Sequence, residues 1–421
     1  LRSNALMDGE RPLLKELEGE LVMGAGQIEA PLISGRLSET TVLLEDLTLV
    51  SSPQELNVRT KVSATGVPLD TKHMQALLEE ELLSSLIEEL GLRGTVDVEQ
   101  GSLDLRVDQD GGREVHFGGD LTLTDMALEA GLPVVVQSAR AHVYDLVLED
   151  GQLRGWGRIE NLYGDCFGSE LGPASALVSY VGGVLSVEDF SGSFERGEIR
   201  PLDQDSEPLS AVRGRPALRI ELRPPFAYQA SLAVEDVDAS RWINGISSDS
   251  VTSTGTLSVK AELDGNLSSL VDTRARGTIH LERSRLWAIP LFRELLREFG
   301  LDYTVMFDEV HFRFDLADEV ISMEGLEVRS PLLKLVGEGS LDMMGRLNHD
   351  LEVHYSIVDR ITPFRRLFYM IQNVFVSVSI RGDLSRPVVR LNNGLLSVFS
   401  GEPEPGLNLP LPGLSPLPPR F

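Results

Sequence analysis

The sequence contains only one cysteine, Cys166, among its 421 residues. A single cysteine excludes an intramolecular disulfide and a cysteine-based zinc site. The redox compartment stays open, because a protein from an oxidising compartment can also lack disulfides. Cys166 is best interpreted as an unreactive, small apolar residue, and not as a nucleophile.

Positive charge is scarce as well. The chain has 38 Lys and Arg residues against 65 Asp and Glu residues, which gives a formal net charge of -27. Such an acidic surface repels phosphate backbones, so nucleic acid is excluded as a partner. Hydrophobic residues make up 42% of the chain, enough for a sizeable core, and wholesale disorder is not expected.

Long apolar runs are missing. The most apolar segment, Ala176 to Val187, is interrupted by serine and glycine, and no segment is long and apolar enough to span a bilayer. The first residues lack the basic region followed by an apolar region that marks a signal peptide. We therefore expect a soluble segment of a longer protein, with any signal or membrane anchor upstream of Leu1.

Motifs for metal binding and catalysis are also missing. The sequence has no HExxH, no EF-hand loop and no GxSxG, and Gly24-Ala-Gly26 lacks the third glycine of a dinucleotide fingerprint. His349 and His354 are the closest histidine pair, but a spacing of five on a strand places them on opposite faces. We interpret the histidines as solvated side chains and expect no metal and no cofactor.

One group of acidic residues allows two interpretations. Asp315, Asp318 and Glu319 are close enough in sequence to form a carboxylate pair for acid–base catalysis. Solvated acids at the end of a strand explain them equally well, and such groups are expected in a chain this acidic. We favour the second interpretation and predict that the protein is not an enzyme.

The strongest positive signal is an alternation of apolar and polar residues with a period of two, which is typical of half-buried β-strands. It recurs from near the start to about residue 391, with turn signals such as Asp110-Gly111-Gly112 and Asp264-Gly265 between the segments. There is no βαβ rhythm. The sequence predicts a mainly β protein: an elongated, twisted antiparallel β-sheet curled into an apolar groove, with a few amphipathic helices. Alternation alone does not distinguish an open groove from a closed sandwich.

Three segments instead have helical periodicity. They run from about Asp70 to Leu90, from Pro290 to Gly300, and from Thr362 to Asn373. Each is expected to cover an end or an edge of the sheet. The proline-rich tail that follows, residues 396–421, is expected to be extended and flexible.

The third helix is the one basic segment of an acidic chain. Arg360, Arg365 and Arg366 lie beside Phe364 and Phe368. A basic amphipathic helix can contact an anionic lipid surface or hold a phosphate head group. The alternative is a helix that closes one end of the sheet, with its arginines paired to local acids. We keep both interpretations.

From about Phe226 to Leu391 a series of short motifs follows in a fixed order. The series is Val234-Glu-Asp-Val237-Asp-Ala-Ser240, Gly255-Thr-Leu-Ser-Val-Lys-Ala-Glu-Leu-Asp-Gly265, Gly277-Thr-Ile-His-Leu281, Leu286-Trp-Ala-Ile-Pro290, Phe307-Asp-Glu-Val310, Gly325-Leu-Glu-Val328, Leu335-Val-Gly-Glu-Gly339 and Gly382-Asp-Leu384-Ser-Arg-Pro387. In this order they resemble the C-terminal region of the AsmA-like family. The resemblance divides the chain into a β-rich groove segment (1–225, with a helix near 70–90), an AsmA-like C-terminal region (226–395) and the flexible tail (396–421).

The resemblance implies relatives such as TamB and YhdP of the Gram-negative envelope, which are similar to the eukaryotic bridge-like lipid-transfer proteins. It implies a periplasmic protein, anchored in the inner membrane through an N-terminal segment outside this chain. Phospholipid would lie along the groove between the inner and outer membranes, and the C-terminal region would contact a membrane surface. The predicted groove floor consists of Leu257, Val259, Phe312, Phe314, Leu351, Val353, Val376 and Val378.

Two other functions are compatible with the same sequence. A structural or assembly factor would aid outer-membrane protein biogenesis by pairing strands along the sheet edge, with envelope proteins as its partners. An enzyme acting on envelope glycans would need a carboxylate pair, for which Asp315 is the first candidate.

Overall fold

A computed structural model describes most of the chain. The described residues are 2–8, 11–37, 40–69, 91–128, 134–149, 152–166, 168–202, 216–240, 255–284, 294–295, 297, 307–331, 333–355, 376–384 and 386–393. Almost all of them lie in β-strands, and together these strands form a single 23-stranded sheet. The mainly β class predicted from the alternation is confirmed.

The strands are long, and many have more than ten residues. They are β1 Arg2–Asp8, β2 Arg11–Gly19, β3 Val22–Gly24, β4 Gln27–Leu37, β5 Thr40–Ser51, β6 Glu55–Pro68, β7 Arg93–Asp108, β8 Arg113–Leu128, β9 Val134–Glu149, β10 Gln152–Cys166, β11 Ser169–Val181, β12 Val184–Phe194, β13 Gly197–Pro201, β14 Leu218–Glu221, β15 Ala227–Asp238, β16 Thr256–Asn266, β17 Ser269–Ser284, β18 Phe307–Ala317, β19 Val320–Arg329, β20 Leu333–Asp342, β21 Arg346–Tyr355, β22 Val376–Asp383 and β23 Arg386–Asn393.

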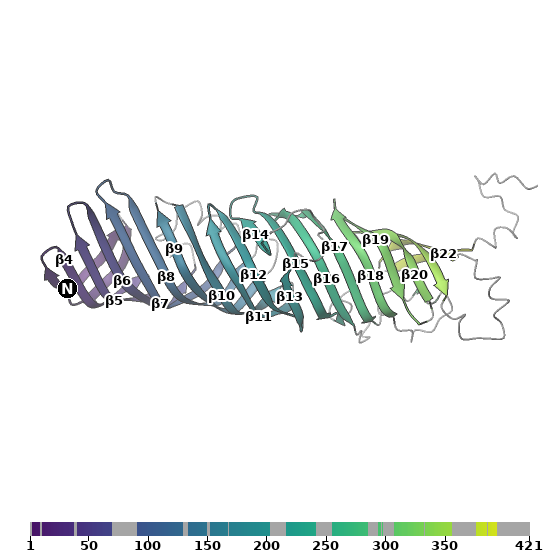
Figure 1. Ribbon diagram of the computed structural model, residues 1–421, viewed down its shortest axis with the longest axis horizontal. Coiled ribbons are helices and arrows are strands. Elements are labelled where there is room, and N and C mark those ends of the chain that lie inside the picture. Colours follow the sequence, from purple (N-terminus) through teal and green to yellow (C-terminus); the bar gives the residue numbers. More distant parts are fainter. Residues whose placement is uncertain are drawn as a thin grey trace, which may run out of the picture.

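Successive strands pair with one another in an antiparallel meander (Figure 1). At two places in the sheet, two strands lie one after the other along the same neighbour. The strands β2 and β3 both pair with β4, and β13 and β14 both pair with β12 and β15. At about 4.8 Å per strand, the sheet extends for about 100 Å in the stacking direction. It also continues across residue 226, because β14 and β15 are hydrogen-bonded neighbours.

The connections between strands differ systematically between the two long rims of the sheet. In a meander, successive turns alternate between the rims, so β7–β8, β9–β10, β11–β12, β14–β15, β16–β17, β18–β19, β20–β21 and β22–β23 turn on the same side. We call this side the turn rim, because all of these connections are short. The opposite side, the loop rim, has the longer connections, including those with the three predicted helices.

Of the predicted helices, only part of the second falls within the described residues. Glu294, Leu295 and Arg297 are helical there, and Leu295 is 1% exposed. Leu295 packs into an apolar cluster on the sheet with Leu281, at the end of β17, and Phe307, at the start of β18. The first and third helices and the tail lie outside the described residues. No helix in the described part is long and apolar enough to cross a membrane.

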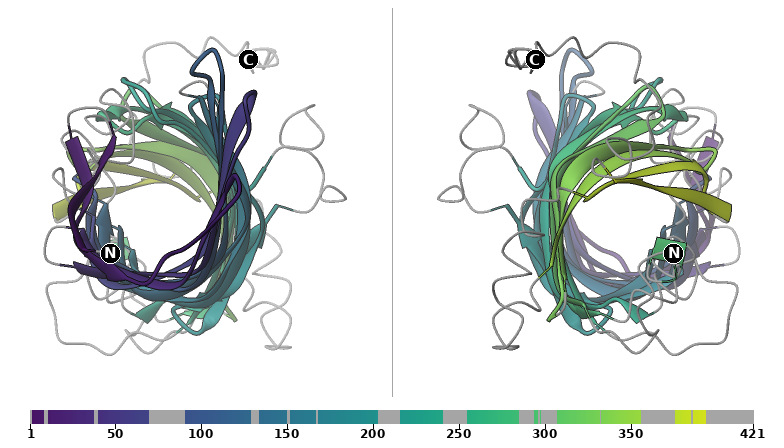
Figure 2. Two further views of the ribbon diagram at one scale, coloured as in Figure 1. Left: turned by 90° about the vertical axis from the view of Figure 1, so that its left-hand side faces the viewer. Right: turned by 90° about the vertical axis from the view of Figure 1, so that its right-hand side faces the viewer.

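The sheet is strongly curved. Viewed along its length, the strands bend round a common axis, so that the sheet has an inner and an outer face (Figure 2). A β-bulge, an extra residue in one strand of a pair, bends that strand and increases its twist. The backbone shows such bulges at regular intervals.

From β6 to β19, every strand that runs in the same direction contains a residue with φ between 45° and 70°, in the left-handed region. These residues are Gly66, Asp125, Asn161, Asp189, Asp236, Arg283 and Gly325. At all of them except Arg283 the register with a neighbouring strand shifts. Repetition of the same distortion on every second strand bends the sheet in a constant sense.

These bulges have a short sequence signature that interrupts the alternation. Two apolar residues are separated by two polar or glycine residues, as in Ile159-Glu-Asn-Leu162, Val187-Glu-Asp-Phe190 and Val234-Glu-Asp-Val237. Asn, Asp and Gly tolerate the left-handed conformation best, which explains their place as the third residue. The extra residue keeps the apolar residues on both sides of the bulge on one face of the sheet.

The sheet forms a single layer. All strands in the described part belong to this one sheet, so no second sheet covers its apolar face. The apolar face is nevertheless the less exposed one: on β18, Phe312 and Phe314 are half-buried, while His311 and Arg313 are exposed. Because curvature crowds the side chains of a concave face, we place the apolar face inside the curl.

The bulge conformation can be tested at Asn161, whose side chain is exposed. Asn161→Val should destabilise the fold by about 1–2 kcal/mol, because a β-branched residue is strained at positive φ, whereas Asn161→Gly should be neutral or stabilising. Chemical denaturation gives the comparison. The matched control is Glu160→Val at the exposed neighbouring position, and equal stability of Asn161→Val and Glu160→Val would rule out the bulge as described.

Candidate functional site

The most extensive feature of the molecule is the continuous apolar surface of the inner face. Directly opposed residues in an antiparallel pair lie on the same face, so the register shows which side chains adjoin across the sheet. Apolar residues oppose one another from strand to strand in overlapping rows, and together these rows extend from β5 to β22.

The first rows cover the N-terminal half. One passes through Leu49, Val58, Leu105, Val115, Leu148 and Leu153. The next passes through Phe117, Leu146, Gly155, Tyr180, Leu185, Ile220 and Tyr228. Both rows include β8, β9 and β10, so the apolar surface is not interrupted between them.

Two further rows continue to the C-terminal end. One passes through Val178, Val187, Leu218, Ala230, Leu263, Ala275, Leu316, Ile321, Leu341 and Leu347. The other, nearer the loop rim, passes through Val237, Leu257, Leu281, Val310, Val328, Leu335, Val353 and Val376. An apolar path therefore crosses nearly the whole sheet, perpendicular to the strands.

The eight residues predicted as groove floor all lie on strands of this C-terminal part, and the register places them on the inner face. These residues differ in how deeply their side chains are buried. Leu257, Val259, Phe312 and Phe314 are half-buried. Leu351, Val353 and Val378 are 4%, 4% and 0% exposed, because they belong to the apolar cluster that also includes Leu295. The side chain of Val376 lies outside the described residues.

The outer face is polar and contains many ion pairs. Arg59 pairs with Asp104 at 3.1 Å, and Arg200 pairs with Glu235 at 3.0 Å. Near the C-terminal end, the Arg381 guanidinium donates to both carboxylate oxygens of Asp350 at 2.9 Å, which lowers the pKa of Asp350. Exposed pairs of this kind contribute little stability, so their main effect is to keep the outer face hydrated.

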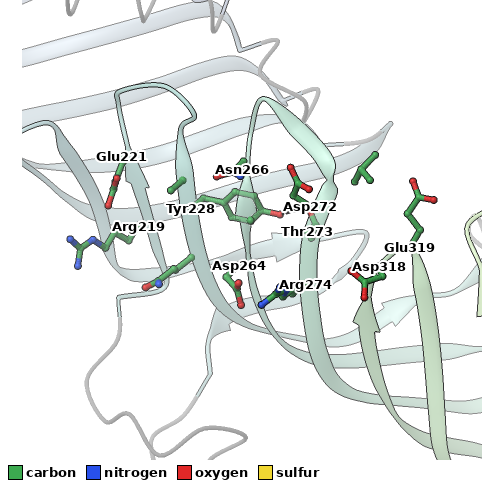
Figure 3. A pocket seen from close by; sticks show the side chains of 14 residues that line it. Arg219, Glu221, Tyr228, Asp264, Asn266, Asp272, Thr273, Arg274, Asp318 and Glu319 are labelled. Atoms are coloured by element: carbon green, nitrogen blue, oxygen red, sulfur yellow. Dashed lines mark hydrogen bonds between the residues drawn. The ribbon is translucent and has the colours of Figure 1, made fainter.

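A pocket lies at the turn rim, between β14 and the β18–β19 turn (Figure 3). Its volume is about 840 Å³, and most of its lining is polar or charged. The buried Tyr228 forms part of its wall, and its hydroxyl lies 3.0 Å from Oγ1 of Thr273. The sequence singles out two parts of its lining, the turn signal Asp264-Gly265 and the acidic residues Asp318 and Glu319. It does not show that they lie together, because they adjoin only through the register of the strands.

His349 contradicts the prediction that the histidines are solvated. It is 4% exposed and lies on the inner face, opposite Gly339 and Ile380. Its Nδ1 has no hydrogen-bond partner in the described part of the chain. Gly339 makes room for the ring, because a Cβ atom there would overlap it. The opposite-face prediction does hold, since His354 is exposed on the outer face.

Burial lowers the pKa of His349, and the positive charge of Arg381 lowers it further, while Asp350 acts in the opposite direction. An imidazole in these surroundings is neutral at pH 7. The apolar inner face thus has a buried imidazole close to its C-terminal end.

The other candidates for chemistry are exposed or shielded. Asp318 and Glu319 are exposed in the β18–β19 turn with positive φ, and Asp315 is exposed on the outer face of β18. Burial, with the charge of Asp165, raises the pKa of the Cys166 thiol, which disfavours the reactive thiolate. Among the residues that the structure covers, no group of three or more His, Cys, Asp or Glu is placed to hold a metal ion.

The predicted head-group residues lie outside the described residues. These are Arg360, Arg365, Arg366, Phe364 and Phe368, in the connection between β21 and β22. That connection is on the loop rim. The contact of this segment with a membrane therefore stays a prediction.

Comparison with known proteins adds no assignment. No protein-family model matches the chain, and no curated protein matches it significantly. The AsmA-like resemblance thus depends only on the order of motifs between Phe226 and Leu391, and it also stays a prediction.

The buried imidazole predicts a pH dependence. The pKa of His349 is lowered from 6.5 on folding, so as the pH falls the unfolded chain takes up a proton before the folded chain does. Stability should be fully present above about pH 6.5 and should decrease as the pH falls toward the lower pKa of the folded state. Amide hydrogen exchange of β20 to β22, compared between about pH 7.5 and about pH 5.5, measures this loss. His349→Leu should show a smaller loss, and equal losses in both proteins would contradict the prediction.

Proposed function

We propose that this chain is a segment of an AsmA-like envelope protein that holds or conducts phospholipids between the inner and outer membranes. The acyl chains would lie along the inner apolar face, and the head groups would stay in water at a rim. The observation that carries the proposal is the apolar inner face, which continues from strand to strand and whose residues on β7, β9 and β18, such as Leu105, Leu148 and Phe312, are only half-buried.

The half-buried part of the inner face is a surface that a ligand can cover. Soluble monomers rarely expose large contiguous apolar patches, and such patches usually mark a binding surface. An acyl chain that fills the groove removes apolar area from water on both partners, and each fully buried methylene contributes about 0.8 kcal/mol. The proposed function needs no catalytic group.

Conduction also needs a surface without deep energy minima. In the overlapping rows, one apolar residue is followed by another on each neighbouring strand, about 4.8 Å away. A lipid that moves from strand to strand would exchange one apolar contact for a similar one. The half-buried residues, such as Leu105, Leu148 and Phe312, are accessible for this contact, whereas the cluster around Leu351 already packs within the protein.

The cellular location follows from the same proposal. A path that joins two membranes places the chain in the periplasm, with anchoring in the inner membrane through a segment outside this sequence. The alternative is a structural or assembly factor for outer-membrane proteins, which would bind client peptides and not lipid.

Site-specific photocrosslinking tests the proposal. Phe312 and Arg313 are neighbours on β18 that lie on the inner and outer face, respectively. A photoreactive residue at position 312 should capture phospholipid several times more often than one at position 313. Equal capture of phospholipid at the two positions would contradict the proposal, and capture of peptide at position 312 would favour the assembly factor.

A further inference from the structure

We propose that the pocket at the turn rim binds the head group of a zwitterionic phospholipid, with its two arginines on the phosphate and its carboxylates on the ammonium group. This inference depends on the proposed function, since it assigns the head-group site for lipids whose acyl chains lie in the groove. It assigns a class of lipid head group, which an apolar face cannot distinguish from other head groups.

The location of the pocket fits this role. Its lining includes Tyr228, Gly265 and Thr273, which the register places on the inner face, and Arg219, Asp264 and Arg274, which it places on the outer face. The pocket therefore extends over the lip of the sheet, from the groove to the solvent. A lipid with its tails on the concave face must cross this lip to hydrate its head group.

Tyr228 joins the pocket to the apolar surface. It is 6% exposed and belongs to an apolar cluster with Ile220, Leu222 and Phe226. It also forms part of the pocket wall. An acyl chain packed on the half-buried residues around this cluster, such as Leu185, Leu218 and Leu263, would therefore place its glycerol and phosphate next to the pocket.

The charges of the pocket are available to a ligand. Arg219, Gln229, Asp264 and Arg274 oppose one another across β14 to β17 and form one polar row. Figure 3 labels its charged members, Arg219, Asp264 and Arg274. Within the described ranges, neither arginine of this row forms an ion pair. Nearby, in contrast, Arg276 pairs with Glu262 at 2.8 Å on the same face.

The mixture of signs selects a zwitterion. Arg219 and Arg274 suit a phosphate, because a guanidinium forms charge-assisted hydrogen bonds with its oxygens. The carboxylates of Asp264, Asp272 and Asp318 repel an anion without a positive group and attract an ammonium. A ligand with both charges a few bonds apart can satisfy both sets, and the head groups of phosphatidylethanolamine and phosphatidylcholine have this chemistry.

Lipid selection by the purified chain tests the inference. The protein is incubated with vesicles of equal parts phosphatidylethanolamine and phosphatidylglycerol, reisolated, and its bound lipid is extracted and quantified. The wild type should be enriched in phosphatidylethanolamine relative to the vesicles. The double variant Arg274→Gln, Asp264→Asn should lose this enrichment by about fivefold, with total bound lipid unchanged.

The matched control is the double variant Arg313→Gln, Asp315→Asn, which neutralises one charge of each sign on β18 outside the pocket. It should retain the enrichment. Bound lipid with the composition of the vesicles, or an equal loss in the control, would overturn the head-group inference and leave the proposed function standing. The absence of bound lipid from every protein would overturn both. Displacement of the lipid by an equal concentration of soluble glycerophosphoethanolamine would identify a site for a soluble zwitterion and would also overturn the inference.

Discussion

The central constraint on this protein is that one face of a single-layer sheet is apolar. A sheet of this kind must bury that face, and the common solution is a second sheet packed about 10 Å away. Here the described strands all belong to one sheet, and curvature reduces the exposure of the apolar face, with Leu295 packed against it near the C-terminal end. The repeated left-handed residues, such as Asn161 and Asp236, produce that curvature. The groove is therefore a consequence of backbone geometry as much as of side-chain pattern.

The two rims then acquire different properties. On the turn rim, short hairpins and charged residues meet water directly, and the one pocket described above opens there. On the loop rim, Leu295 from the β17–β18 connection packs against the inner face beside Leu281 and Phe307. A ligand with an apolar and a polar end would find its polar surroundings at the turn rim. The net charge of -27 keeps the outer face hydrated and limits association between copies through that face.

The sequence predicts part of this account well. Alternation along β18, from Val310 to Leu316, identifies both the strand and its apolar face, because a period of two has a direct geometric meaning. It does not show whether the sheet closes, since a sandwich gives the same alternation. The signature Val234-Glu-Asp-Val237 lies at the end of β15, and the alternation does not show that it forms a bulge at Asp236 before the strand ends at Asp238. The burial of His349 and the pocket around Tyr228 depend on cross-strand register, which no local pattern reveals.

The proposed function and the head-group site both require that phospholipid occupies the inner face. Native mass spectrometry of the purified chain, together with lipid extraction, measures this most directly. The account predicts that phospholipid co-purifies with the folded protein and that its release leaves a species with the mass of the chain alone. A folded protein that carries no lipid, even after incubation with phospholipid vesicles, would contradict it.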